Sequence, residues 1–109
     1  MNRARMVSLL GGLVLCGVGT SCIARDPASI TSQDPDCLIP AIKEGVIAKD
    51  RKIIPYLVDN LQSDDSAVRF YSIDGLERLT GHDFGYVFYA DEDQRKEAYL
   101  RWKKWLAQQ

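Results

Sequence analysis

The side chains of this chain that could do chemistry are few and scattered. The single histidine, His82, precedes Asp83 in an expected loop, and neighbouring residues on a chain need not face each other. The acidic run Asp91 to Asp93 could bind a divalent cation weakly, but its place before an expected helix favours capping. A zinc site needs several His or Cys ligands at suitable spacing, which His82 and Cys37 do not supply. We therefore predict no catalytic residue, no metal site and no cofactor.

The N-terminus has the features of an export signal. Arg3 and Arg5 precede an uncharged, mostly apolar run from Met6 to Gly19, and small residues then lead to Cys22. A basic start, an apolar stretch of about 7–15 residues and a small-residue exit typify a secretory signal. The run is shorter than the about 20 apolar residues that span a bilayer. We predict a signal peptide over residues 1–21, with a retained membrane anchor as the alternative.

Cys22 could carry a covalent modification. The segment GTSC at residues 19–22 resembles a bacterial lipobox, in which the signal is cut before a cysteine whose sulfur has been acylated. Gly19 departs from that family, which usually has Leu or another aliphatic residue there. The resemblance implies lipidation of Cys22 and attachment to a membrane of the bacterial cell envelope. A secreted or periplasmic product of an ordinary signal, or a disulfide between Cys22 and Cys37, are the alternatives.

A polar segment with two prolines separates the signal from the expected domain. Residues 22–35 (CIARDPASITSQDP) indicate a flexible tether, and residues 36–109 then form one small domain. Without residues 1–21 the chain has 12 basic and 15 acidic residues, a net charge of −3. Nucleic-acid binding normally requires a basic surface, so we predict no nucleic-acid partner.

Residues 36–62 show the apolar spacing of two helices. We expect Asp36 to cap a first helix that runs to about Ile47. A second helix is expected to begin at Arg51–Ile53 and to end near Gln62, with Pro55 delaying or distorting its first turn. The apolar positions expected to be buried are Leu38, Ile39, Ile42, Val46, Ile54, Leu57, Val58 and Leu61.

A third helix is expected from the acidic turn Ser63–Ser66 to about Thr80, with Gly81 as its stop. The small residues Ser72 and Gly75 on its apolar face would permit close approach of a neighbouring helix. That face consists of Val68, Tyr71, Ser72, Gly75, Leu76 and Leu79, with Ile73 beside it. The residues expected to point elsewhere are Arg69, Asp74, Glu77 and Arg78.

A fourth helix is expected from Glu92 to Leu106, with Asp91 as its cap. Its apolar side is narrow and consists of Ala98, Tyr99, Trp102, Trp105 and Leu106. The acidic residues at its start and Lys103 and Lys104 at its end suit the helix dipole. This placement favours a dipole and solvent role for the lysines over nucleic-acid binding.

The connection between the third and fourth helices, HDFGYVFYA at residues 82–90, is rich in aromatic residues. Two interpretations are open. Phe84, Tyr86, Phe88 and Tyr89 could fold back over the helices, because so small a domain needs the burial. They could instead form an exposed patch that binds a partner, because contiguous exposed apolar surface often marks an interaction site.

The helical segments also resemble a known family. IIPYLVDNL followed by SDDSAVRFYSIDGLERLTG resembles HEAT repeats, including those of phycobiliprotein lyases and of many bacterial HEAT-repeat proteins. The tail, with Arg95, Ala98, Trp102 and Trp105, is similar to a small exported group that ends in a tryptophan helix. The resemblance implies an all-α fold: a short HEAT-like α-solenoid of about four helices, capped by a C-terminal Trp-containing helix. It typically implies protein–protein binding.

These observations together predict an exported, lipid-anchored, HEAT-like protein-interaction module without catalytic activity. Its protein partner is unknown from the sequence, and its membrane contact would be the lipid at Cys22. The alternative is an accessory subunit related to lyase-type HEAT proteins. Lyase activity requires a site that handles a bilin, and no residue of this chain matches one.

Overall fold

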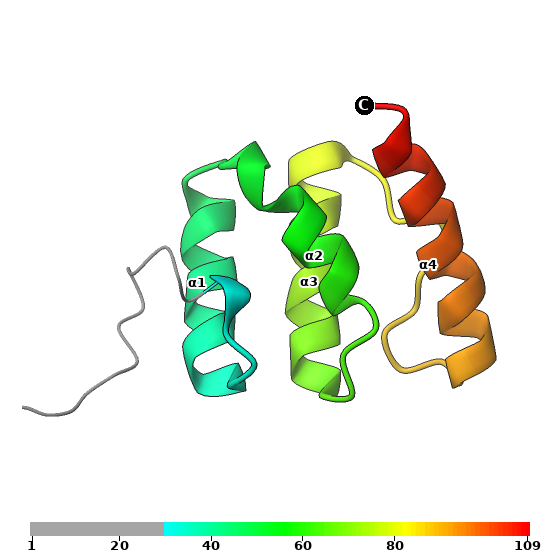
Figure 1. Cartoon of the computed structure of the whole chain (residues 1–109), viewed down its shortest axis with the longest axis horizontal. Helices are drawn as coiled ribbons and strands as arrows, with labels where there is room; N and C mark the ends of the chain where they lie inside the picture. The colour runs from blue at the N-terminus through cyan, green and yellow to red at the C-terminus, as the bar shows by residue number, and fades with distance from the viewer. Residues whose placement is uncertain (1–29) are drawn as a thin grey trace, which may run out of the picture.

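Four α-helices form the part of the chain after residue 29 (Figure 1). The computed structural model describes residues 30–109; the expected signal peptide, Cys22 and most of the expected tether lie outside the described residues. The helices are α1 (Pro35–Ile47), α2 (Ile54–Asn60), α3 (Ser66–Thr80) and α4 (Glu92–Ala107), with the 3-10 turn η3 (Arg51–Ile53) before α2. Residues 30–109 contain no strand, so the all-α prediction is confirmed. No helix of this range is long and apolar enough to span a membrane.

An aspartate precedes α1, η3, α3 and α4, and its carboxylate accepts an N–H of the first turn. These residues are Asp34, Asp50, Asp65 and Asp91. The prediction of Asp36 as the first cap is wrong, because Asp34 Oδ1 accepts the Asp36 N–H at 2.9 Å and α1 already begins at Pro35. Proline suits this first position, since its φ is helical and its missing N–H would have no helical partner.

Two other boundary predictions are confirmed. Pro55 lies in the first turn of α2, directly after η3, so the start of this helix is distorted as expected. Gly81 ends α3 in the left-handed conformation, with φ of 81°, and its N–H donates to Glu77 O at 2.8 Å. Glycine adopts this conformation without the steric cost that a Cβ would add.

Helix α3 is the centre of the domain, because α1 and α2 both pack against it, whereas α4 packs against α2. Figure 1 shows that α1, α3 and α4 run in the same direction and that α2 runs opposite to them. Since α3 and α4 are parallel, the connection at residues 81–91 must return along the length of α3. This connection contains the aromatic residues noted above.

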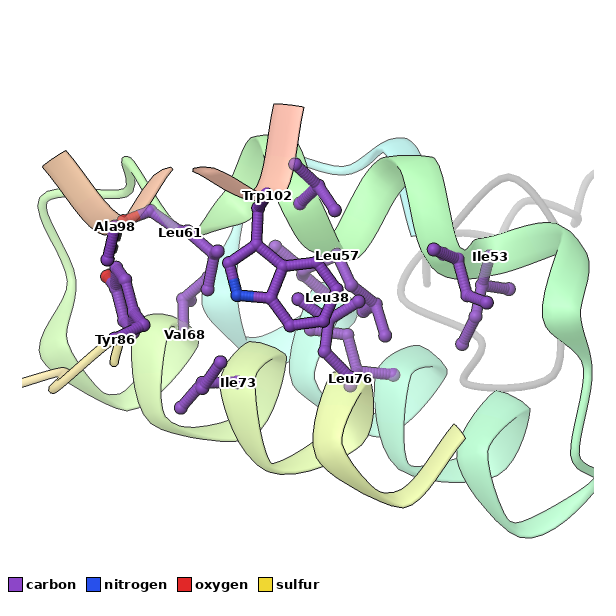
Figure 2. Close-up of a cluster of buried hydrophobic side chains, with 13 residues drawn as sticks. Leu38, Ile53, Leu57, Leu61, Val68, Ile73, Leu76, Tyr86, Ala98 and Trp102 are labelled. Atoms are coloured by element: carbon purple, nitrogen blue, oxygen red, sulfur yellow. Dashed lines mark hydrogen bonds between the residues drawn. The ribbon is translucent and has the colours of Figure 1, made fainter. Parts of the chain in front are cut away.

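The hydrophobic core lies where the four helices meet (Figure 2), and the Trp102 indole projects into it from α4. The largest fully buried apolar side chains are Ile42, Leu57, Val58, Leu61, Val68, Leu76 and Trp102. Gly75 allows α3 to pack closely: a Cβ there would lie 2.8 Å from Val46 Cγ2 of α1 and 3.1 Å from Leu57 Cδ1 of α2. The predicted close approach at Gly75 is therefore confirmed.

Candidate functional site

The loop at residues 82–90, called the aromatic loop below, lies between α3 and α4 without regular secondary structure. From α4, Trp102 Nε1 donates to Asp83 O at 3.1 Å, and Arg101 Nε donates to Phe84 O at 2.9 Å. A loop without a backbone ladder has carbonyls that need other donors. These two side chains supply them and fix the first half of the loop against α4.

Arg69 of α3 fixes the second half of the loop. Its Nε donates to Phe88 O at 3.0 Å, and its Nη1 donates to Ser63 O at 2.7 Å. The prediction that Arg69 points away from the core is wrong: only 9% of the residue is exposed. The physical reason is that two carbonyls outside the helices require a long donor, and the guanidinium group supplies both bonds.

A tight turn begins the loop. The Asp83 carboxylate accepts the Gly85 N–H at 2.8 Å, and the Asp83 carbonyl accepts the Tyr86 N–H at 3.0 Å. Phe84 and Gly85 both have positive φ, 52° and 77°. Phe84 is a bulky residue in a conformation that usually requires glycine. Its ring packs against the Trp102 indole in a T-shaped arrangement, with centroids 4.7 Å apart. This packing offsets the backbone strain.

Tyr86 joins the loop to the helical core. Its hydroxyl donates to Leu61 O at 2.5 Å, and the residue is only 5% exposed. Burial raises the pKa of Tyr86 above its ordinary value of 10.0, while the charges of Arg69 and Arg95 oppose that rise. The neutral phenol is thus the form that stabilises the fold.

We expect Tyr86→Phe to lower the free energy of unfolding by about 1–2 kcal/mol at neutral pH, because Leu61 O loses its buried donor. The pH dependence has a definite sign. Because the folded-state pKa is raised, the contribution of Tyr86 is complete below about pH 10 and is lost as pH rises through the folded pKa. In urea unfolding at neutral and alkaline pH, the difference in the free energy of unfolding between wild type and Tyr86→Phe should become smaller as pH rises. A difference that stays constant would contradict this account.

The four predicted partner-binding residues, Phe84, Tyr86, Phe88 and Tyr89, differ in their burial. Tyr86 is buried, and Phe84 and Phe88 are half-buried against the core. Tyr89 is different, because 72% of it is exposed. The first three cover the helices, as one interpretation expected, and Tyr89 is the member of the set that is open to solvent.

Tyr89 belongs to a group of aromatic rings from two separate segments, which was not predicted from the sequence. Phe88 contacts Tyr89 edge-on with centroids 5.0 Å apart, and on its other side contacts Phe70 of α3 at 5.2 Å. Phe70 is 41% exposed. We call Phe70, Phe88 and Tyr89 the aromatic patch. Phe70 was not among the predicted partner-binding residues; it lies outside the predicted apolar face of α3, and a large aromatic residue in such a position is a signal of an exposed ring.

The residues that the sequence offered as candidates for catalysis or metal binding have local structural roles in the fold. His82 stacks on Phe84 with centroids 5.0 Å apart, Asp83 fixes the turn, and Asp91 caps α4. Within residues 30–109, no three side chains of His, Cys, Asp or Glu are grouped to bind a metal ion. Cys37, in the first turn of α1, is disulfide-bonded, and the other cysteines of the chain lie outside the described residues.

Comparisons with protein-family models, with curated protein sequences and with solved structures gave no match to this chain. The geometry of the aromatic loop and its patch is therefore the basis of the functional argument.

Proposed function

We propose that this protein is an exported, lipid-anchored interaction module of the bacterial cell envelope, without catalytic activity, that binds a protein partner through its aromatic patch. The observation that carries this proposal is the exposure of Tyr89 and Phe70 on a fixed loop and helix. Aromatic side chains are common anchors of protein interfaces because they bury a large area. They are also seldom left exposed together without a role.

The fixed position of the patch favours binding. Phe88 O accepts from the buried Arg69, and the Phe88 ring lies between those of Phe70 and Tyr89. A surface that is already ordered loses less conformational entropy when a partner binds. The aromatic loop thus combines the two roles considered from the sequence: its inner residues cover the core, and its outer residue is presented to solvent.

A HEAT-like architecture is the second part of the proposal. The antiparallel helices α2 and α3 are joined by a short acidic turn, and α1 packs beside α3, as helix pairs do in a solenoid. The domain departs from a regular solenoid after α3, where the aromatic loop, in place of a helix, runs back along α3. The patch lies at this departure.

Site-specific photo-crosslinking in living cells tests the patch. A photoreactive phenylalanine analogue replaces Tyr89 in the full chain, and a matched control places it at Leu100, which is 54% exposed on α4. We expect an adduct of one defined mass from position 89, weaker in the presence of Phe70→Ala, and none from position 100. Equal adducts from both positions, or none from position 89, would contradict the proposal.

The state of Cys22 decides how the module is attached. Cleavage before Cys22 removes Cys16, and acylation consumes the Cys22 thiol, so a lipidated chain cannot also contain a Cys22–Cys37 disulfide. The observed disulfide of Cys37 favours a second candidate, an exported module without a lipid. The mass of the mature protein, with and without reduction, separates the two. Acyl groups on an N-terminal Cys22 would support the lipid-anchored module, and a reducible bond to Cys37 within the chain would support the module without a lipid.

A further inference from the structure

The ends of α1, α3 and α4 lie together on one side of the domain, because these helices run in the same direction (Figure 1). We infer that this side, called the basic end below, docks on the anionic surface of a lipid bilayer. The inference extends the proposed membrane attachment, but it concerns the surface of the folded domain and applies with or without a lipid on Cys22. The exposed cations of the basic end are Lys49, Arg51, Lys52 and Lys104.

Arg51 connects the elements of the basic end. Its Nη1 donates to Leu79 O at 2.6 Å, so the η3 turn is fixed to the end of α3. Beside it lies a shallow groove of about 250 Å³ between η3, α2 and α4. The groove is mainly apolar, and its lining residues are Arg51, Ile54, Pro55, Trp105, Leu106 and Gln109. Trp105 and Leu106 are only half-buried.

Two acidic residues of the basic end, Asp50 and Asp83, accept backbone N–H groups, whereas Glu77, in the last turn of α3, is exposed. Asp50 accepts the Lys52 N–H at 3.0 Å, and Asp83 accepts the Gly85 N–H at 2.8 Å. The opposite side of the domain has the acidic helix starts, namely Asp34, Asp36, Asp64, Asp65, Asp91, Glu92 and Asp93. An anionic surface would therefore attract one end of the domain and repel the other, although the mature chain is acidic as a whole.

The side chains of the basic end fit a bilayer in particular. Tryptophan concentrates at membrane interfaces, where its ring meets the apolar boundary, and lysine and arginine bind anionic headgroups. Trp105 and Leu106 supply the apolar contact, and Arg51, which lines the same groove, supplies a cation together with the lysines of the basic end. An acidic protein or nucleic acid would use the charges but would not need the apolar groove.

The chain is long enough for this orientation. Residues 22–30 extend at most about 28 Å, which exceeds the length of α1, about 20 Å for its 13 residues. A chain attached at Cys22 can therefore bring either end of the domain to the membrane, and the charges select the basic end. The aromatic patch, beside the starts of α3 and α4, would then face away from the bilayer toward a partner.

Tryptophan quenching tests the inference. The mature protein, purified from membranes, is reconstituted into vesicles of phosphatidylcholine with bromine-labelled acyl chains, with or without phosphatidylglycerol. Trp102 is fully buried in the protein, so quenching would come from Trp105. We expect quenching only in the vesicles that contain phosphatidylglycerol, its loss at high salt, and its absence in Trp105→Phe. If mass analysis shows that the protein is unacylated, it is added to the same vesicles from solution, with the same expectation.

Charge reversals on one helix provide the matched control. Each cation near an anionic surface contributes roughly fivefold to membrane binding, so Lys104→Glu should lower the ratio of docked to undocked protein by about tenfold or more. Lys96→Glu makes the same change on α4 at the acidic end and should have little effect. Quenching that is absent in anionic vesicles, independent of lipid charge, or equally sensitive to both variants would overturn the inference. Such results would leave the proposed partner binding untouched, because that is read from the crosslink at position 89.

Discussion

Trp102→Ala is expected to lower the free energy of unfolding by about 3–5 kcal/mol, enough to unfold a large fraction of so small a domain. Trp102 is fully buried, its indole packs edge-on against Phe84, and its Nε1 donates to Asp83 O at 3.1 Å. The substitution would thus leave a cavity between α4 and the core and remove a donor from the aromatic loop. Thermal and urea unfolding followed by circular dichroism measure the loss.

The control for this prediction is Leu100→Ala, on the same helix. Leu100 is 54% exposed, so its truncation removes little buried area and should change the free energy of unfolding by less than about 0.5 kcal/mol. If Trp102→Ala unfolds at the same urea concentration as Leu100→Ala, α4 does not seal the core as described.

Arg69→Met is expected to lower the free energy of unfolding by about 2–4 kcal/mol. The buried guanidinium donates to Phe88 O and to Ser63 O, at 3.0 and 2.7 Å. Methionine preserves part of the apolar packing but leaves both carbonyls without this donor, and hydrogen bonds to charged groups contribute about 1.5–3 kcal/mol each. Equilibrium unfolding in urea provides the measurement.

Arg78→Met is the matched comparison, because it makes the same change on the same helix. Arg78 pairs with Asp74 at 2.8 Å, but its side chain is 67% exposed. An exposed pair of this spacing contributes about 0.5 kcal/mol or less. Similar losses for Arg69→Met and Arg78→Met would show that Arg69 does not support the loop.

The local boundaries of the helices were largely predictable because short-range chemistry determines them. Asp91 caps α4 and Gly81 ends α3, as predicted, and the cap of α3, Asp65, lies in the acidic turn predicted to precede that helix. The cap of α1 was misplaced by two residues because Asp34 and Asp36 flank Pro35, and both are suitable residues. Only the preference of proline for the first helical position distinguishes them.

The path of the aromatic loop could not be predicted, because it depends on contacts between residues far apart in the chain. Arg69 and Phe88 are 19 residues apart, and so are Asp83 and Trp102. Helical periodicity placed Arg69 away from the apolar face and could not indicate that its guanidinium would donate to two backbone carbonyls. The parallel direction of α3 and α4 likewise follows from the loop running back along α3.

The candidate site was predicted in part for the same reason. The aromatic composition of residues 82–90 indicated that the rings either cover the helices or form an exposed patch. In the structure Tyr86 is buried against the helices and Tyr89 is exposed to solvent. The contribution of Phe70 depends on its contact with Phe88, which no spacing rule on one helix contains. A surface patch built from two segments is therefore harder to predict than a buried face built from one.

Amide hydrogen exchange of the mature protein tests the central claim most directly, namely that residues 82–90 form a fixed layer on the helical core. The Tyr86 N–H donates to Asp83 O and the Ala90 N–H donates to Val87 O, both at 3.0 Å. We predict that the Tyr86 amide is protected to the same degree as the amides of α4, and that Arg69→Met reduces this protection. Exchange of residues 84–90 at the rate of an unfolded peptide, while α1 to α3 stay protected, would contradict the account.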